Sequence, residues 1–171
     1  KKRNKLNNYQ LALNYFNQTL TKEKKSGRKL QEAATLTNVG LCYVGLNKID
    51  KGLEAYLKAV DLYVENNIEV EAATVYGNIG LIYLNNKKDY KQAFIYLNKS
   101  AKLHEETHEV SSLADVYSAL SSLYTEQNNF SKALIYGEKA VENAKLANSK
   151  SSIMKANDGL AFAYYKNKNY K

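Results

Sequence analysis

Residue types that interrupt or cross-link a chain are rare in this sequence. Its 171 residues contain no proline, no tryptophan, 8 glycines and one cysteine, Cys42. Because a proline inside a helix costs roughly 3 kcal/mol, its absence leaves long helices uninterrupted. A single cysteine excludes an intramolecular disulfide framework and fits a reducing compartment, so we expect a cytoplasmic protein. Cys42 lies on an apolar stretch, where a free thiol packs as a small hydrophobe.

The sequence also lacks an apolar run long enough for a membrane helix, so we expect no membrane span. The net charge of +8 is confined to one end of the chain: residues 1–30 contain nine basic residues and one acidic residue, and the remainder contains 16 of each. A nucleic-acid interface instead carries a basic stripe along its binding face. We therefore predict no nucleic-acid partner and interpret these residues as solvated helix ends, with a docking site for an anionic partner as the alternative.

What the sequence does contain is a repeat with a period of 40 or 41 residues. Four tyrosines follow this spacing, and each is preceded three residues earlier by a small residue. A second series has a large apolar or aromatic residue followed three positions later by a small one. The first series is Tyr43, Tyr83, Tyr124 and Tyr164 with Gly40, Gly80, Ser121 and Ala161; the second is Ile49, Tyr90, Phe130 and Tyr170 with Gly52, Ala93 and Ala133, extended upstream by Tyr9 and Ala12.

These positions predict pairs of closely packed amphipathic helices. A small residue lets a partner helix approach, and the ring one turn further fills the space beside it. Apolar residues recur at steps of three and four, which indicates helices of about 18 residues. Asn-rich segments predict the connecting turns, because Asn tolerates left-handed backbone geometry; they are residues 46–48, 85–89, 127–129 and 167–169.

The pattern small-x-x-Tyr in one helix and aromatic-x-x-Ala in the next resembles the tetratricopeptide repeat. The period is longer than the usual repeat of about 34 residues, and the customary proline after the second helix is missing. The first-helix motif at residues 77–83, Gly-Asn-x-Gly-x-x-Tyr, resembles a subclass with extended helices. This subclass includes spindle-orientation adaptors, kinesin light chains, and the sensor domains of bacterial peptide-pheromone receptors and some histidine kinases. The resemblance implies an all-α, right-handed superhelix of antiparallel helix pairs.

We expect one array, cut from a longer one. Its divisions are a partial pair at 1–27, pairs at 28–67, 68–108 and 109–148, and a partial pair at 149–171. In this register residues 1–7 are the tail of a first helix, and the second helix follows from Tyr9. Tyr170 and Lys171 form the first turn of another second helix.

Residues 104–108 match the H-E-x-x-H pattern, in which two histidines bind zinc and the glutamate acts as general base. In the register of the repeat, however, His104 aligns with Tyr63 and Ala144 at the end of a second helix, and His108 falls in the following junction. No third ligand is identifiable. We therefore expect a solvated helix end with adventitious metal binding at most, and neither a catalytic metal nor a cofactor.

The resemblance implies that first helices line a concave groove and that an Asn near the small residue binds the backbone of a peptide. The matching residues are Asn38 and Asn78, followed by Ala119 and Gly159 in the later repeats. The alternative is that both amides bond only to neighbouring helices. Further candidates on the same face are Leu41, Leu81, Ser122 and Phe162, with Thr74, Asp115 and Lys155 one turn before and Asn85 one turn after.

These candidates predict a non-enzymatic scaffold that binds a protein or peptide in its concave groove. A carboxylate clamp for chaperone C-termini is not predicted, because the corresponding positions are Thr37 and Leu41. The alternative function is a ligand- or peptide-sensing regulatory segment of a larger signalling or transcription-regulating protein. Replacing Asn38 and Asn78 together with Ala is expected to abolish partner binding.

Overall fold

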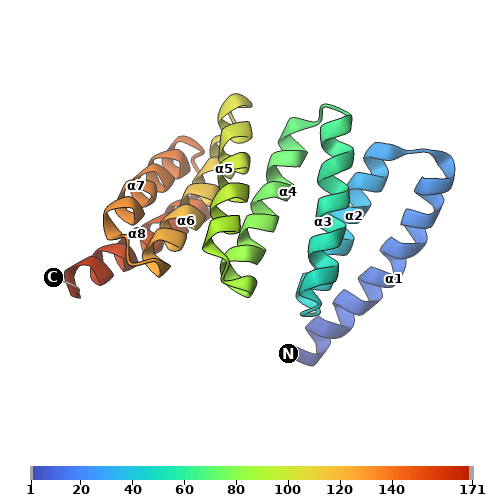
Figure 1. Cartoon of the computed structure of the whole chain (residues 1–171), viewed down its shortest axis with the longest axis horizontal. Helices are drawn as coiled ribbons and strands as arrows, with labels where there is room; N and C mark the ends of the chain where they lie inside the picture. The colour runs from blue at the N-terminus through green and yellow to red at the C-terminus, as the bar shows by residue number, and fades with distance from the viewer. Residues whose placement is uncertain (1, 170–171) are drawn as a thin grey trace.

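The helices of this protein stand side by side in a row, as the repeat predicts. The computed structural model describes residues 2–169. Within them lie eight α-helices and no strand, and the first and last helices lie at opposite ends of the row (Figure 1). The helices are α1 (Lys2–Ser26), α2 (Lys29–Gly45), α3 (Ile49–Glu65), α4 (Glu69–Ile82), α5 (Tyr90–Glu106), α6 (Val110–Glu126), α7 (Phe130–Leu146) and α8 (Lys150–Asn169).

Neighbouring helices pack as antiparallel pairs, α2 with α3, α4 with α5 and α6 with α7. Helix α1 packs on α2, and α8 packs on both α6 and α7. This arrangement confirms the all-α, right-handed superhelix predicted from the repeat. No helix in the described part of the chain is both long and apolar enough to cross a membrane.

Each connection between helices contains one residue with positive φ. In the first turn, the backbone N–H of Asn47 donates to the carbonyl of Val44 at 2.9 Å, and that of Lys48 donates to Tyr43 at 2.8 Å. These two bonds are the Schellman arrangement, which needs a left-handed residue just after the helix. The residues with positive φ are Gly27, Asn47, Asn67, Lys88, His108, Asn128 and Asn148, and their spacing is 20 residues except for one step of 21.

The step of 21 residues has a local cause. After α4 the chain forms a short π-helix, η1 (Tyr83–Lys87), which takes up one residue more than an α-helical turn. As a result, the backbone N–H of Asp89 reaches the carbonyl of Tyr83, six positions earlier, at 3.0 Å. The extra residue in the sequence period is therefore an insertion at the end of this first helix.

The small residues of the repeat lie where helices approach most closely. A Cβ atom added at Gly80 would lie 2.7 Å from the Leu97 Cγ atom, and one added at Gly40 would lie 2.7 Å from the ring of Tyr56. The Tyr83 ring stacks on the ring of Tyr96 with centroids 5.5 Å apart. The same stacking, again at 5.5 Å, recurs between Tyr124 and Tyr136 in the next pair. Close approach and ring packing thus repeat together, as the sequence predicts.

Two predicted breaks are wrong, because the helix continues through them. Helix α1 runs without interruption from Lys2 to Ser26, so residues 1–7 and the segment from Tyr9 are not separate helices. Residues 167–169, predicted as a turn, belong to α8. Elsewhere in the array such a turn is held by two helices that pack on each other. Without that packing among the described residues, local hydrogen bonding favours continuous helix at both places. The predicted helix start at Tyr170 lies outside the described residues.

Candidate functional site

A cavity of about 340 Å³ opens between the helices of the central and C-terminal pairs. Its walls come from α4, α6 and α8, which are successive first helices, and its floor comes from α5. Seven of the side chains predicted for this face line it: Thr74, Asn78, Leu81, Asn85, Asp115, Ser122 and Lys155. Residues that are 41 positions apart in the sequence, such as Leu81 and Ser122, therefore meet at one site.

Three predicted groove residues lie outside this cavity. Asn38 and Leu41 are exposed on α2, and Phe162 is exposed on α8. Leu41 is 53% exposed and Phe162 is 51% exposed, which is high for such large apolar side chains. The structure thus concentrates the cavity on the middle of the array and leaves these three residues on open surface.

The amide side chains at the cavity have free hydrogen-bonding capacity. No residue in the described range accepts from or donates to the side chain of Asn78 or Asn85. By contrast, the hydroxyl groups of Thr74 and Ser122 donate to carbonyls of their own helices, at 3.1 Å and 3.0 Å. Asn85 reaches the rim because it lies in η1, where the extra residue changes the direction of the chain. Both amides can therefore donate and accept towards a molecule in the cavity.

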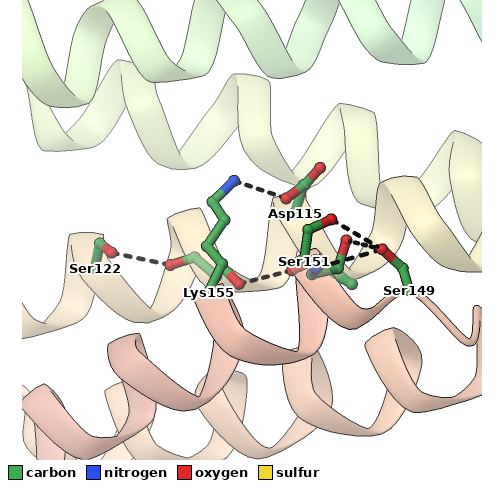
Figure 2. Close-up of polar contacts among 8 residues, drawn as sticks. Asp115, Ser122, Ser149, Ser151 and Lys155 are labelled. Carbon is green, nitrogen blue, oxygen red and sulfur yellow. Dashed lines mark hydrogen bonds and ion pairs between the residues drawn. The ribbon is translucent and has the colours of Figure 1, made fainter.

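One ion pair crosses the mouth of the cavity. The Lys155 ammonium group of α8 lies 2.7 Å from the Asp115 carboxylate of α6 (Figure 2). The first turn of α8 is fixed by Ser149, whose hydroxyl oxygen accepts the backbone N–H of Ser152 at 3.3 Å. Because the two charged side chains are 63% and 55% exposed, the pair contributes little to stability. Its effect is to neutralise the two charged residues among those that line the cavity.

The floor of the cavity includes two polar residues of α5, Ser100 and His104. Sequence reasoning predicted His104 to be solvated, and this is wrong, since the side chain is only 1% exposed. Burial lowers the pKa of the His104 imidazole, and the nearby Glu109 carboxylate opposes that shift only in part. The repeat register contained the missed signal: His104 aligns with Tyr63 and Ala144, which are also buried.

The zinc pattern does not assemble into a site. His108 has a φ of 58° and lies in the turn after α5, so the two histidines are not on one helical face. The Glu105 carboxylate, which would be the general base, accepts a hydrogen bond from the Tyr117 hydroxyl group. Across residues 2–169 no cluster of three or more His, Cys, Asp or Glu side chains could hold a metal ion. Cys42 is buried, and burial raises the pKa of its thiol, which makes it a poor nucleophile.

Comparison with known proteins gives matches over most of the chain. A tetratricopeptide repeat model matches residues 71–145, and a second such model matches residues 33–63. Response regulator aspartate phosphatase I of Bacillus subtilis (strain 168) is 31% identical over 159 residues. That match includes 89% of this chain but 39% of the relative, so the chain spans well under half of the relative's length.

Solved structures show the same fold at low sequence identity. BtubC (BKLC) from P. vanneervenii superposes with a TM-score of 0.71 at 13% identity, over 99% of this chain and 85% of that one. A putative kinesin light chain with nearly identical TPR-like repeats, from Podosopora anserina, superposes with a TM-score of 0.71 at 15% identity, over 98% and 84%. At these identities the likeness concerns the fold alone.

Proposed function

Because the chain belongs to the tetratricopeptide repeat family, an architecture of protein–protein interaction, we propose that it is a scaffold that holds an extended peptide segment of a partner. The segment lies in the groove across α4, α6 and α8. The observation that supports this proposal is the cavity, in which side chains from these three first helices and from η1 surround one space. The proposed role is binding, with no catalytic step.

The chemistry of the cavity wall suits an extended main chain. The Asn78 and Asn85 amides can each donate to a carbonyl and accept from an N–H of the same peptide. Leu81, which is 40% exposed, offers an apolar surface between them. Since these groups are carried by rigid helices, little conformational entropy is lost when a ligand binds. The groove residues predicted from the sequence that lie outside the cavity, Asn38 and Leu41, extend the proposed surface towards α2.

The first test of this proposal is replacement of Asn78 with Ala. A heptapeptide selected from a random display library on the wild-type chain, labelled with fluorescein, serves as the ligand. We expect its affinity to fall about tenfold in the Asn78→Ala variant, since two hydrogen bonds to the peptide backbone are lost. Combining Asn38→Ala with Asn78→Ala is expected to abolish binding where the peptide extends to α2. Fluorescence anisotropy gives the dissociation constants.

The matched control for this test is Asn157→Ala. Asn157 is exposed and lies two positions from both Lys155 and Gly159, which line the cavity, so it is on another face of α8. Its replacement is expected to leave the affinity unchanged. Equal affinities for the wild-type chain and for the Asn78→Ala variant would contradict the assignment of the groove.

A second candidate function is supported by the relative from Bacillus subtilis, which is named for an action on response regulators. In this proposal the chain is the peptide-sensing segment of a larger cytoplasmic regulatory protein, and binding changes the curvature of the array. Spin labels at Gln10→Cys on α1 and Asn157→Cys on α8, in a Cys42→Ala background, measure the distance across it. The selected peptide shifts this distance in a sensor and leaves it unchanged in a constitutive scaffold.

A further inference from the structure

Two buried polar groups at the floor of the cavity have no partner in the part of the chain that the structure describes. Ser100 is 0% exposed and His104 is 1% exposed, and both line the cavity. Neither the Ser100 Oγ atom nor the His104 Nδ1 atom has a hydrogen-bond partner within residues 2–169. The two residues are four positions apart on α5, so their side chains lie on the same face of the helix. Buried polar groups are nearly always hydrogen-bonded, and each exception calls for an explanation.

The neighbouring repeats do not share this feature. In α3 the corresponding residues are Ala59 and Tyr63, and in α7 they are Ala140 and Ala144. Both alanines of α7 are 0% exposed and have no polar side-chain atom. In α3, burial raises the pKa of the Tyr63 hydroxyl group, and a side-chain hydrogen bond with Thr37 opposes this rise. The Tyr63 hydroxyl group therefore has a partner. Of these three helix pairs, the central one, α4 with α5, is therefore the one in which the described residues leave polar atoms without a partner at these two positions. These atoms lie next to the cavity.

Helix α4 approaches the floor of the cavity closely at a glycine. A Cβ atom added at Gly77 on α4 would lie 3.1 Å from the Ser100 Oγ atom. The first helices on either side carry Thr37 and Ser118 at this position of the repeat. The absence of a side chain at Gly77 therefore lets α4 approach the Ser100 hydroxyl group, which an added side chain would crowd.

We infer that Ser100 and His104 form a specificity pocket for an uncharged carboxamide side chain, Gln or Asn, of the bound peptide. This inference rests on the proposed function. A carboxamide offers one acceptor oxygen and two N–H donors on a single planar group. A neutral imidazole and a hydroxyl group can each donate or accept, so one carboxamide can satisfy both.

The charges around the pocket favour a neutral ligand. Asp115 and Lys155, the charged residues at the cavity wall, neutralise each other at 2.7 Å. Glu105 accepts from the Tyr117 hydroxyl group, and so it is already engaged. The Glu109 carboxylate, which acts on His104, does not line the cavity. A charged peptide side chain would therefore be removed from water without an unpaired counter-charge among the residues that line the cavity, which is strongly unfavourable. An apolar side chain would leave both buried groups unsatisfied.

Three matched pentapeptides test the pocket: acetyl-Gly-Ala-Xaa-Ala-Gly-amide with Gln, Met or Glu as Xaa. Titration into the 15N-labelled chain gives two NMR readouts. Backbone amide shifts on α4 and α6 report occupation of the groove, and the imidazole 15N shifts report the pocket. A His108→Asn background leaves His104 as the single imidazole. We expect the Gln peptide to bind about tenfold more tightly than the Met and Glu peptides and to move the His104 signal.

The variant Ser100→Ala/His104→Ala introduces the residues that α7 carries at the same positions, so the helix pair is expected to fold. This variant should bind the Gln and Met peptides with about equal affinity. Gly77→Ala keeps both polar groups but places a methyl group about 3.1 Å from the Ser100 Oγ atom, so it should weaken Gln binding. Asn157→Ala is its control, because Asn157 is exposed and lies on another face of α8 than the cavity-lining Lys155 and Gly159.

The possible outcomes separate this inference from the proposed function. The Gln and Met peptides could cause equal changes in the backbone amide shifts of α4 and α6 and leave the His104 imidazole signal unmoved. This result would show that water alone satisfies the Ser100 hydroxyl group and the His104 imidazole. That result overturns the pocket and leaves the groove in place. Tightest binding of the Glu peptide also overturns it. No amide shift with any of the three peptides overturns the pocket and counts against the groove as well.

Discussion

Replacement of Leu120 with Ala is expected to lower the free energy of unfolding by about 2–5 kcal/mol. Leu120 is 0% exposed and belongs to the largest core cluster, which joins α5, α6, α7 and α8. The substitution removes buried apolar volume and leaves a cavity that rigid helices fill only in part. In a repeat array each pair is stabilised by its neighbours, so the loss extends to the packing of α7 and α8. Urea denaturation followed by far-UV circular dichroism measures the change.

Leu146→Ala is the matched control for this prediction. Leu146 is the last residue of α7 and is 67% exposed. The same substitution there should change the free energy of unfolding by about 0.5 kcal/mol or less. Similar losses for the two variants would contradict the packing described for α6.

The second large effect is expected at Gly80. Alanine is the better helix former by about 1 kcal/mol, so propensity alone predicts that Gly80→Ala stabilises the chain. The added Cβ atom, however, would lie 2.7 Å from the Leu97 Cγ atom and 3.1 Å from the Leu97 backbone nitrogen. Overpacking of this kind costs typically 1–3 kcal/mol or more, and a backbone atom moves less readily than a side chain. We therefore expect net destabilisation of about 1–2 kcal/mol.

The same substitution at Gly159 should have the opposite sign. A Cβ atom at Gly159 meets nothing within 4 Å, so the gain in helix propensity is not opposed. Gly159→Ala is expected to raise the free energy of unfolding by up to about 1 kcal/mol. Thermal unfolding of the two variants beside the wild-type chain compares them directly. A stabilised Gly80→Ala variant would show that α4 and α5 do not approach as closely as described.

The parts of the fold that follow from local, repeated residues could be predicted from the sequence. Small residues at Gly40 and Gly80 determine the close approach of α2 to α3 and of α4 to α5, and Asn47 and Asn128 determine where helices end. These effects act within one or two turns of helix and recur with the period. For that reason the helix pairs and the face that carries the groove were accessible without coordinates.

Features that depend on packing between repeats could not be predicted from the sequence in the same way. The burial of His104 depends on α4 and α6 covering the end of α5, although its alignment with Tyr63 indicated a core position. The placement of Asn85 depends on the π-helical turn η1; the two residue series put the extra residue between Tyr83 and Tyr90 but do not indicate a π-helix. The continuity of α1 through Asn7 was likewise not predicted, because the repeat register alone placed a break there.

The position of a bound peptide tests the central claim most directly. A display-selected peptide that carries a nitroxide label broadens the NMR signals of amides close to it. The account predicts broadening on α4, α6 and α8 around Asn78, Leu81 and Ser122, with the exposed faces of α3 and α7 unaffected. Broadening confined to α3 and α7, or none at peptide concentrations that saturate binding, would contradict it.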